Sequence, residues 1–284
     1  MRKSIRTCPV CGAMDVEPLH TQLFELPSGH PLSNGYEVVN CTACGFVFAD
    51  ANVTQSDYDR FYSEFSKYED QKTGTASGEG LFDQARLKIT ALQIAEFLDD
   101  TTARILDVGC ANGGLLRELK GLGYKNICGL DPSPIWVENT RALGLEAHPG
   151  SLFQPFPYGK FDCVVLSHTL EHVQDVHGAV HWISEVLSSG GKQVAYIEVP
   201  DATRYVDFLY APFQDFNTEH INHFSKVSLK NAMGLAGFED VESGVKIFTI
   251  SSNMEYPAIF GFWKKSTNEM IKKNGTGHRL GYSG

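Results

Sequence analysis

Four cysteines form two closely spaced pairs near the start of the chain, one in CPVCG and the other in CTACG. Two C-x-x-C pairs supply four thiolates, which is the ligand set of a tetrahedral zinc site. Because four sulfur ligands leave zinc no open position for a substrate, such an ion would have a structural role. The spacing therefore predicts a small β-rich zinc ribbon over residues 1–50, with the ligands Cys8, Cys11, Cys41 and Cys44.

The stretch ILDVGCANGG is an apolar run that ends in small residues and carries one acid, Asp107. Gly109, Ala111 and Gly114 fit the dinucleotide-binding pattern G-x-G/A-x-x-G. Asp131 follows about 20 residues later, where a ribose-binding acid belongs. A dinucleotide, however, would bring its negatively charged pyrophosphate close to Asp107, and the charges would repel each other. A ligand that carries positive charge fits this loop better.

The same loop resembles the donor-binding loop of class I S-adenosylmethionine (SAM) methyltransferases. Their pattern D/E-x-G-x-G-x-G is similar to DVGCANG, with Ala111 at the middle glycine. SAM carries a sulfonium and an ammonium cation, which a carboxylate at Asp107 would stabilise. Further segments resemble the family in the same order along the chain, namely GLDPSP, PGSLFQPFP, FDCVVLSHTLEHV and LSSGGKQVAYIEVP.

The resemblance also implies roles for individual residues. Asp131 would accept hydrogen bonds from the ribose hydroxyls of the donor, and Ser151 and Leu152 would line its adenine. Ser167 and His168 would contact its methionine part. The full set of donor-binding residues implied in this way is Asp107, Gly109, Cys110, Ala111, Gly113, Asp131, Pro132, Ser151, Leu152, Ser167 and His168.

Two histidine pairs lie in segments expected at the same end of the sheet: His168 and His172 flank TLE, and His220 and His223 flank IN. Methyl transfer to oxygen or carbon requires that the acceptor be aligned with the donor and lose a proton. Histidine accepts a proton readily near neutral pH. We therefore expect His220 to be the general base, assisted by His172 and oriented by its neighbour Glu219.

The elements that must position these residues alternate along the rest of the chain. A helical pattern begins at Leu81, and the strand-like runs ARILDVG, NICGLD, FDCVVLSH and KQVAYIEVP alternate with helix-like segments. This order predicts an α/β fold with a Rossmann-like, mainly parallel sheet and helices on both faces. Ligands of such sheets bind beyond the carboxyl ends of the strands. We expect the catalytic domain to span residues 81–274, after a connector or flap over residues 51–80 and before a flexible tail over residues 275–284.

The composition limits the class of partner. The 284 residues include 34 Asp and Glu against 24 Lys and Arg, a formal net charge of -10. Such a field repels phosphate backbones and anionic bilayers, so neither nucleic acid nor a membrane is the expected partner. No apolar run approaches the roughly 20 residues that span a bilayer, and the first residues lack a signal-peptide core. We expect a cytoplasmic protein that acts on a small molecule; the sequence does not indicate its oligomeric state.

The combination of zinc ribbon and methyltransferase domain resembles the sugar-nucleotide C-methyltransferase group. FNTEHINHFS shares Glu219, His220 and Ser225 with that group's Y-x-E-H-x-x-Y-x-S stretch and differs from it at Asn217 and His223. The group's further carboxyl-terminal domain has no counterpart in this sequence. The resemblance implies methyl transfer to oxygen or carbon of a sugar nucleotide or of a related glycan or natural-product precursor.

Three other functions fit parts of the pattern. A zinc-containing RNA methyltransferase would need a basic stripe beside the ribbon, for which MRKSIR is too short. An NAD-dependent oxidoreductase would use the same glycine-rich loop. A non-catalytic protein with the SAM-binding fold would use its ribbon to bind a partner protein.

Overall fold

The structure is a computed structural model that describes residues 1–64, 80–190, 193–207, 213–251 and 254–266. Half of the connector expected over residues 51–80, namely residues 65–79, and the whole of the expected tail lie outside these ranges. None of the described helices is long and apolar enough to cross a bilayer. The helices are α1 (Gln55–Glu64), α2 (Leu81–Leu98), α3 (Gly114–Gly121), α4 (Pro134–Ala142), α5 (Val176–Val186) and α6 (Lys226–Leu235), with the short 3-10 helices η2 (Leu170–His172) and η3 (Ala202–Asp207).

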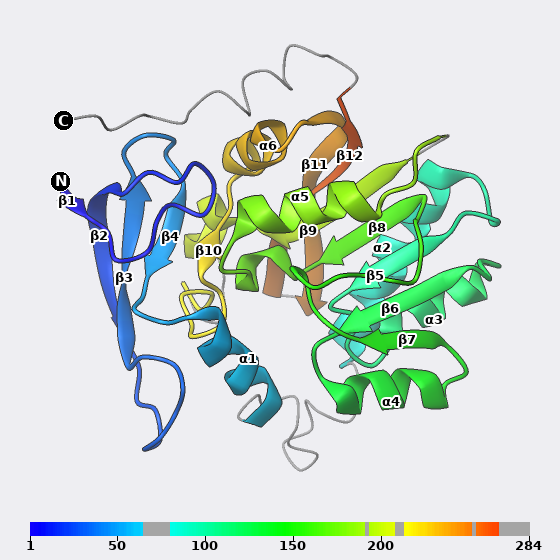
Figure 1. The fold of residues 1–284 in the computed structure, drawn as a ribbon, viewed down its shortest axis with the longest axis horizontal. Helices are drawn as coiled ribbons and strands as arrows, with labels where there is room; N and C mark the ends of the chain where they lie inside the picture. Colours follow the sequence, from blue (N-terminus) through cyan, green and yellow to red (C-terminus); the bar gives the residue numbers. More distant parts are fainter. Residues whose placement is uncertain (65–79, 191–192, 208–212, 252–253, 267–284) are drawn as a thin grey trace.

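The larger of two sheets is the framework of the right-hand part of Figure 1. Its seven strands have the spatial order β11-β12-β9-β8-β5-β6-β7. The five strands from β9 to β7 are parallel, and β12 and β11 extend them with antiparallel pairing. This arrangement confirms the predicted α/β fold with a mainly parallel sheet. The strands are β5 (Ile105–Val108), β6 (Ile127–Asp131), β7 (Glu146–Pro149), β8 (Cys163–Ser167), β9 (Val194–Pro200), β11 (Phe238–Ser251) and β12 (Met254–Lys265).

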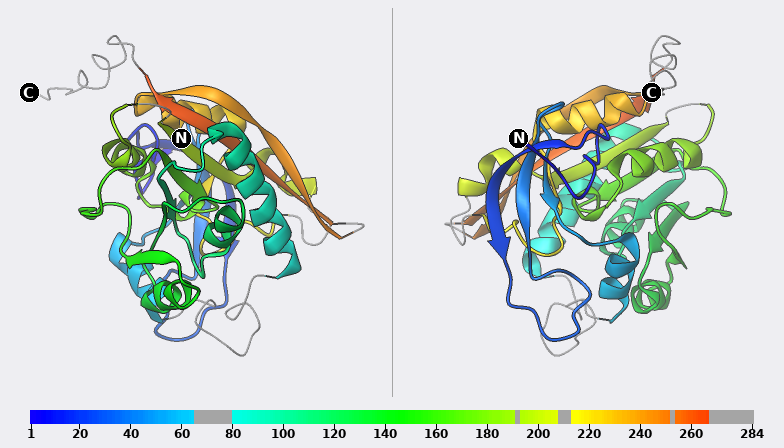
Figure 2. Two further views of the ribbon diagram at one scale, coloured as in Figure 1. Left: turned by 90° about the vertical axis from the view of Figure 1, so that its right-hand side faces the viewer. Right: turned by 60° about the vertical axis from the view of Figure 1, so that its left-hand side comes forward.

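Helices cover both faces of this sheet (Figures 1 and 2). Side chains alternate along each strand, so Leu106 and Val164 join the core under α5 and α6, whereas Ile105 and Val165 join the core under α2 and α3. Strands that are buried on both faces read as continuous apolar runs, which is why they were visible in the sequence. From β5 the chain adds β6 and then β7 on one side, and afterwards β8 and β9 on the other side of β5. In such sheets a ligand site forms where the order switches, here between the carboxyl ends of β5 and β8.

The smaller sheet is antiparallel and has the order β1-β2-β3-β4-β10. Four of its strands come from the first 50 residues, but β10 follows His220 in the sequence and pairs with β4 through Asn222 and Phe48. The amino-terminal sheet therefore includes part of the segment expected to carry the general base. Its strands are β1 (Arg2–Lys3), β2 (Asp15–Leu23), β3 (Gly35–Cys41), β4 (Val47–Asp50) and β10 (Asn222–His223).

Arg6 is buried where the two sheets meet. Its guanidinium donates hydrogen bonds to the carbonyl oxygen of Gln174 at 2.6 Å, the carbonyl oxygen of Ile221 at 3.2 Å and the side-chain oxygen of Asn222 at 2.9 Å. Asn222 in turn donates to the carbonyl oxygen of Val173 at 2.6 Å. Burial lowers the pKa of Arg6 to about 10, so the side chain remains charged near neutral pH. One cation from the amino-terminal sheet thus ties together the segments that follow His172 and His220.

We predict that Arg6→Ala destabilises the protein by about 3 kcal/mol, because several buried carbonyl oxygens lose their hydrogen-bond donor together. Lys3→Ala is the matched control, since its ion pair with Asp15 is solvent-exposed and worth well under about 1 kcal/mol. Chemical denaturation of both variants measures the difference. Equal stabilities would show that Arg6 does not hold the two sheets together.

Candidate active site

A cavity of about 470 Å³ opens at the carboxyl ends of the parallel strands. It is lined by the loop after β5, the end of β6, the loop after β7, the end of β8 and η2, and by parts of α1 and α2. Ten of the eleven predicted donor-binding residues line it: Asp107, Gly109, Cys110, Ala111, Asp131, Pro132, Ser151, Leu152, Ser167 and His168. The predicted catalytic residues Glu219, His220 and His172 line the same cavity.

The glycine-rich loop has a backbone that requires small residues at two positions. Gly109 has a φ of 77°, and a Cβ there would lie 2.7 Å from the hydroxyl oxygen of Thr169. Gly113, the one predicted donor-binding residue outside the lining, has a φ of 78° and is the N-cap of α3, where a Cβ would meet Thr140 at 2.8 Å. Gly113 therefore shapes the loop, and Gly109 lines the cavity.

Asp131 ends β6 and holds the loop in place. One carboxylate oxygen accepts a hydrogen bond from the backbone N–H of Ala111 at 2.8 Å, and the other accepts one from the N–H of Ser133 at 2.9 Å. Burial raises the pKa of Asp131 to about 6 although these hydrogen bonds lower it. The carboxylate thus faces the cavity with its position fixed by two backbone groups.

Asp107 lies at the end of β5 and is only 4% exposed. Its pKa is raised to about 7, mainly by burial and further by the nearby charge of Asp131, while the more distant charge of Arg86 lowers it. Burial therefore disfavours the charged form of Asp107. A cationic group in the cavity would favour it, which is the property expected of a SAM site.

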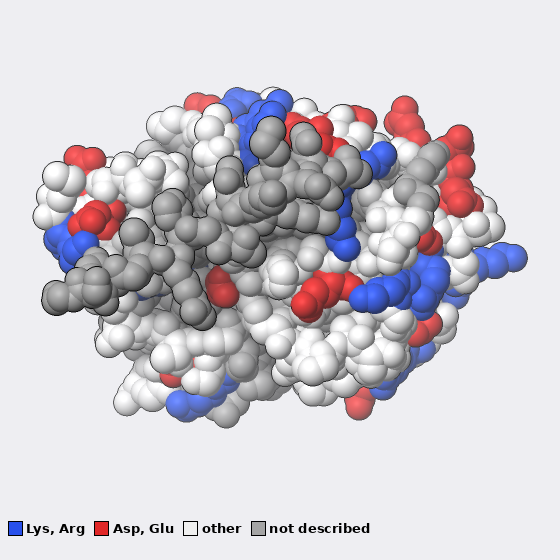
Figure 3. All heavy atoms as spheres, turned by 45° about the horizontal axis from the view of Figure 1, so that its top comes forward, with Lys and Arg blue, Asp and Glu red and all other residues white. Residues whose placement is uncertain are grey.

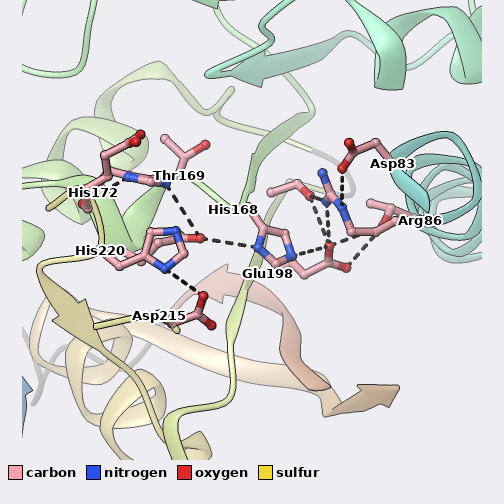
Figure 4. A network of polar contacts seen from close by, with 12 residues as sticks. Asp83, Arg86, His168, Thr169, His172, Glu198, Asp215 and His220 are labelled. Atoms are coloured by element: carbon pink, nitrogen blue, oxygen red, sulfur yellow. Dashed lines mark hydrogen bonds and ion pairs between the residues drawn. The ribbon is translucent and has the colours of Figure 1, made fainter. Parts of the chain in front are cut away.

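Glu198, on β9, is a fully buried carboxylate beside the cavity with several cationic and hydroxyl partners (Figure 4). Lys246 lies 2.8 Å from one oxygen, and Arg86 lies 3.3 Å from the other. The hydroxyl of Tyr196 donates to Glu198 at 2.6 Å. Burial raises the pKa of Glu198, but His168, Lys246 and Arg86 together lower it well below the usual range. Glu198 thereby fixes the direction of Arg86, which also lines the cavity.

His168 lies between two buried acids at the end of β8. Its Nδ1 is 3.3 Å from Glu171 and its Nε2 is 3.4 Å from Glu198. Burial and Arg86 lower the pKa of His168, but the contacts with both acids outweigh them, and the pKa is raised. The residue also has a φ of 55°, in the left-handed region that non-glycine residues seldom adopt. Strain of this kind persists where the surrounding structure holds the residue in place.

His172 and His220 meet in the wall of the cavity, with their ring centroids 4.8 Å apart. Nδ1 of His172 lies 3.1 Å from the carbonyl oxygen of Glu219 and 3.1 Å from the hydroxyl of Tyr62. Nδ1 of His220 lies 3.5 Å from a carboxylate oxygen of Asp215, as Figure 4 shows. Both rings are therefore held through Nδ1.

The structure separates His223 from the other three histidines of the two predicted pairs. His223 lies on β10, is buried, and has its Nδ1 3.4 Å from the hydroxyl of Tyr205. Burial and, to a smaller extent, the charge of Arg6 lower its pKa to about 3, so the ring is neutral near pH 7. It is not among the residues that line the cavity.

Arg86, Glu171 and Tyr256 are among the lining residues that the sequence did not point to. Arg86 lies within α2, and no motif marks it. Glu171 was read only as part of the LEH stretch. Glu171 and Glu198 are both buried. The sign that the sequence offered is an acid within an apolar run, as Glu198 is in VAYIEVP, because an acid is seldom buried there without a functional or structural partner.

The two cysteine pairs come together at one end of the amino-terminal sheet. All four sulfur atoms lie within 4.8 Å of one another, and the distances Cys8–Cys44 and Cys11–Cys41 are both 3.6 Å. Sulfur atoms around a tetrahedral zinc ion lie about 3.8 Å apart, since Zn–S bonds are about 2.3 Å long. None of these cysteines forms a disulfide. The four residues therefore fit zinc.

Solved structures show the same fold. Magnesium protoporphyrin IX methyltransferase from Synechocystis PCC 6803, with bound SAH, superposes with a TM-score of 0.57 at 14% identity and covers 75% of this chain and 100% of that chain. A SAM-dependent methyltransferase from Methanosarcina mazei superposes with a TM-score of 0.50 at 16% identity, covering 62% and 98%. At such low identity these likenesses show the fold and nothing finer.

Two curated relatives are similar over about half of this chain. Ajmaline N-methyltransferase from Rauvolfia serpentina is 32% identical over 143 residues, 46% of this chain and 49% of the relative. A ubiquinone biosynthesis O-methyltransferase from Xanthomonas oryzae pv. oryzae is 28% identical over 152 residues, 51% of this chain and 61% of the relative. Both matches thus span less than two thirds of the relative. The protein-family model for a methyltransferase domain matches residues 81–243, which is more than half of the chain. The chain belongs to the methyltransferase domain family and has its Rossmann-like fold.

Proposed function

We propose that the protein transfers a methyl group from SAM to oxygen or carbon of a small polar acceptor, most specifically a sugar nucleotide or a glycan or natural-product precursor. The observation that carries this proposal is one continuous cavity that is lined both by Asp107 and Asp131 and by His172 and His220. The names of the two curated relatives, an N- and an O-methyltransferase of small molecules, support an acceptor of this size.

The end of the cavity near β5 and β6 suits the donor. Asp107 is a buried acid that a cation would stabilise, and Asp131 has carboxylate oxygens with lone pairs left to accept ribose hydroxyls. Ser151 and Leu152 line the adjoining wall, where the adenine is expected. SAM supplies a methyl group on a sulfonium, which leaves as a neutral thioether. The chain needs only to align the donor with the acceptor and to receive a proton.

The opposite end suits a polar acceptor. Tyr62, Tyr256, Glu219 and the two histidines line it, and they offer hydroxyl, carboxylate and imidazole groups to a hydroxyl-rich ligand. With Asp215 beside Nδ1 of His220, the proton on this ring is favoured at Nδ1 and the lone pair at Nε2. His220 is therefore the proposed general base, with His172 as its assistant; the orienting role of Glu219 stays a prediction.

The proposed zinc ion has a structural role, because four cysteines would complete its coordination. The ribbon that it would stabilise pairs with β10, two residues after His220. Zinc thus supports the acceptor end of the cavity at a distance and takes no part in the chemistry. A cytoplasmic location remains the prediction made from the sequence.

The surface gives little support to an RNA substrate. On the face seen in Figure 3, lysine and arginine side chains are interspersed with aspartate and glutamate among the described residues. A polyanion would require basic groups gathered along one path. Nicotinamide oxidoreductase chemistry is also disfavoured, because the buried Asp107 would face the pyrophosphate.

The activity is tested by incubating the protein with SAM and a panel of deoxysugar nucleotides, followed by mass spectrometry. We expect one product to gain one methyl group and SAM to become its demethylated thioether. Counting the protons on the product then distinguishes oxygen from carbon as the acceptor. Calorimetry without any SAM binding would favour a non-catalytic protein of the same fold.

We predict that Asp107→Asn weakens SAM binding about tenfold or more and stabilises the ligand-free protein. The folded-state pKa of about 7 exceeds the unfolded value of about 4, so the wild type loses stability as pH rises between these values. The advantage of the asparagine variant should therefore grow from about pH 4 to pH 7, reach a few kcal/mol and then level off. Thermal unfolding at several pH values measures it. Asp15→Asn, an exposed acid, should show no such trend.

We predict that His220→Asn lowers turnover by about 100-fold or more while leaving SAM affinity unchanged, because the acceptor loses its base and the donor end stays intact. His181→Asn is the control, since His181 is exposed on α5. Steady-state kinetics and calorimetry measure the two effects. Unchanged turnover would remove His220 from the mechanism.

We predict that chelation releases about one zinc ion per chain and unfolds mainly residues 1–50. Because β10 belongs to the same sheet, hydrogen exchange should also increase around residues 219–223, and turnover should fall while SAM still binds. Metal analysis and hydrogen-exchange mass spectrometry measure these changes. If all four cysteines react freely with a thiol reagent in the untreated protein, the zinc site is wrong.

A further inference from the structure

Glu171 has an environment that the proposed function does not explain. It lies in η2, is fully buried, and neither of its carboxylate oxygens accepts a hydrogen bond from the described residues. The charged groups recorded near it are the imidazoles of His168, at 3.3 Å, and His172, at 4.0 Å. His168 is an ion-pair partner for one oxygen of Glu171, but neither oxygen accepts a hydrogen bond, so the carboxylate still has lone pairs to offer a cation in the cavity that it lines.

Two imidazoles, those of His172 and His220, direct their lone pairs toward the space that the carboxylate of Glu171 also faces. The carbonyl oxygen of Glu219 can only accept a hydrogen bond, so Nδ1 of His172 carries the proton and Nε2, the nitrogen nearer Glu171, carries the lone pair. Asp215 favours the same form of His220, and Figure 4 shows the other side of that ring turned toward His172. Histidines that bind metals have this arrangement, with the second ring N–H directed at a carbonyl or carboxylate.

We propose that Glu171, His172 and His220 bind a divalent transition-metal ion at the acceptor end of the cavity. One ligand atom from each lies within 4.8 Å of the other two. Ligand atoms around an ion with bonds of about 2.1 Å lie roughly 3 to 3.5 Å apart, so the most widely separated atoms would approach one another by up to about 1.5 Å on binding. Two imidazoles and one carboxylate favour manganese, iron, cobalt or zinc over magnesium or calcium, and they leave coordination positions for an acceptor.

This site deepens the proposed function and rests on it for its role. An acceptor hydroxyl bound to the ion would have a lowered pKa and would lose its proton to water. Its oxygen would then form the bond to the methyl carbon while the carbon–sulfur bond breaks and the electron pair stays on sulfur. The ion uses the lone pair of His220, so His220 is a metal ligand in the loaded protein and the general base only in the metal-free protein.

The test is a titration of the zinc-containing protein with Mn²⁺, followed by electron paramagnetic resonance. Mn²⁺ prefers oxygen and nitrogen ligands over thiolates, so it does not compete for the cysteine site. We expect about one bound Mn²⁺ per chain, and Glu171→Gln to weaken binding by about 100-fold or more. The control is Glu185→Gln, which alters the exposed pair of His181 and Glu185 on α5 and should leave binding unchanged.

Thermal unfolding gives a second readout that also reports correct folding of the variant. Without added metal, Glu171→Gln should unfold in a single cooperative transition like the wild type, which shows that the variant is folded. Added Mn²⁺ should raise the unfolding temperature of the wild type and not that of the variant.

The site is refuted if the wild type fails to bind Mn²⁺ or if Glu171→Gln binds it equally well. In that case a slow His220→Asn variant still supports the general base, so the proposed function survives. Conversely, Mn²⁺ binding in a protein that does not bind SAM would support the site and refute the proposed function.

Discussion

The arrangement of the active site depends on how buried carboxylates obtain compensating charge. Asp107, Asp131, Glu171 and Glu198 surround one cavity, and none of them is more than 6% exposed. Each such charge must be matched by cations or hydrogen bonds, or it takes up a proton. Glu198 is matched inside the protein by Arg86, Lys246 and His168, and its pKa is low. The protein itself therefore neutralises only part of the acidic charge around its own cavity.

The other three acids differ from Glu198 in a way that indicates ligands. Asp131 has backbone amides on both oxygens, which position it but supply no full charge. Asp107 has a pKa near 7 in the absence of a cation, and Glu171 has no hydrogen bond from the described residues. Both residues line the cavity. They are therefore the acids through which we propose that the protein binds an organic cation and a metal ion.

The amino-terminal sheet completes the acceptor end through backbone contacts. The pairing of β4 with β10 fixes the strand that follows His220, and Ile221 donates its N–H to the carbonyl oxygen of Glu171 at 2.9 Å. Arg6 joins the segments after His172 and His220 from behind. A ribbon held by four cysteines is rigid and small, so it can fix this loop without entering the cavity. The two parts of the chain therefore form one site, although the sequence presents them as separate units.

The sequence revealed the features that depend on local pattern. The parallel strands appear as apolar runs, the loop after β5 requires small residues at Gly109 and Gly113, and both cysteine pairs have a zinc-binding spacing. It did not reveal pairs that form only when distant segments meet, such as Arg86 with Glu198 or Asp215 with His220. The addition of β10 to the amino-terminal sheet is of the same kind, because a strand of two residues has no periodicity. The fold was thus more predictable than the partners of the histidines proposed to be catalytic.

The position of Glu171 next to the histidines limits how the site can handle a proton. A proton and a metal ion require the same imidazole lone pairs, so His172 and His220 cannot act as bases and as ligands at once. A general base needs the lone pair of one imidazole, whereas a metal ion would use the lone pairs of both rings and a carboxylate oxygen of Glu171. Removing that carboxylate would therefore abolish metal-assisted removal of the proton and leave a histidine base in place, which makes Glu171 the residue that distinguishes the two mechanisms.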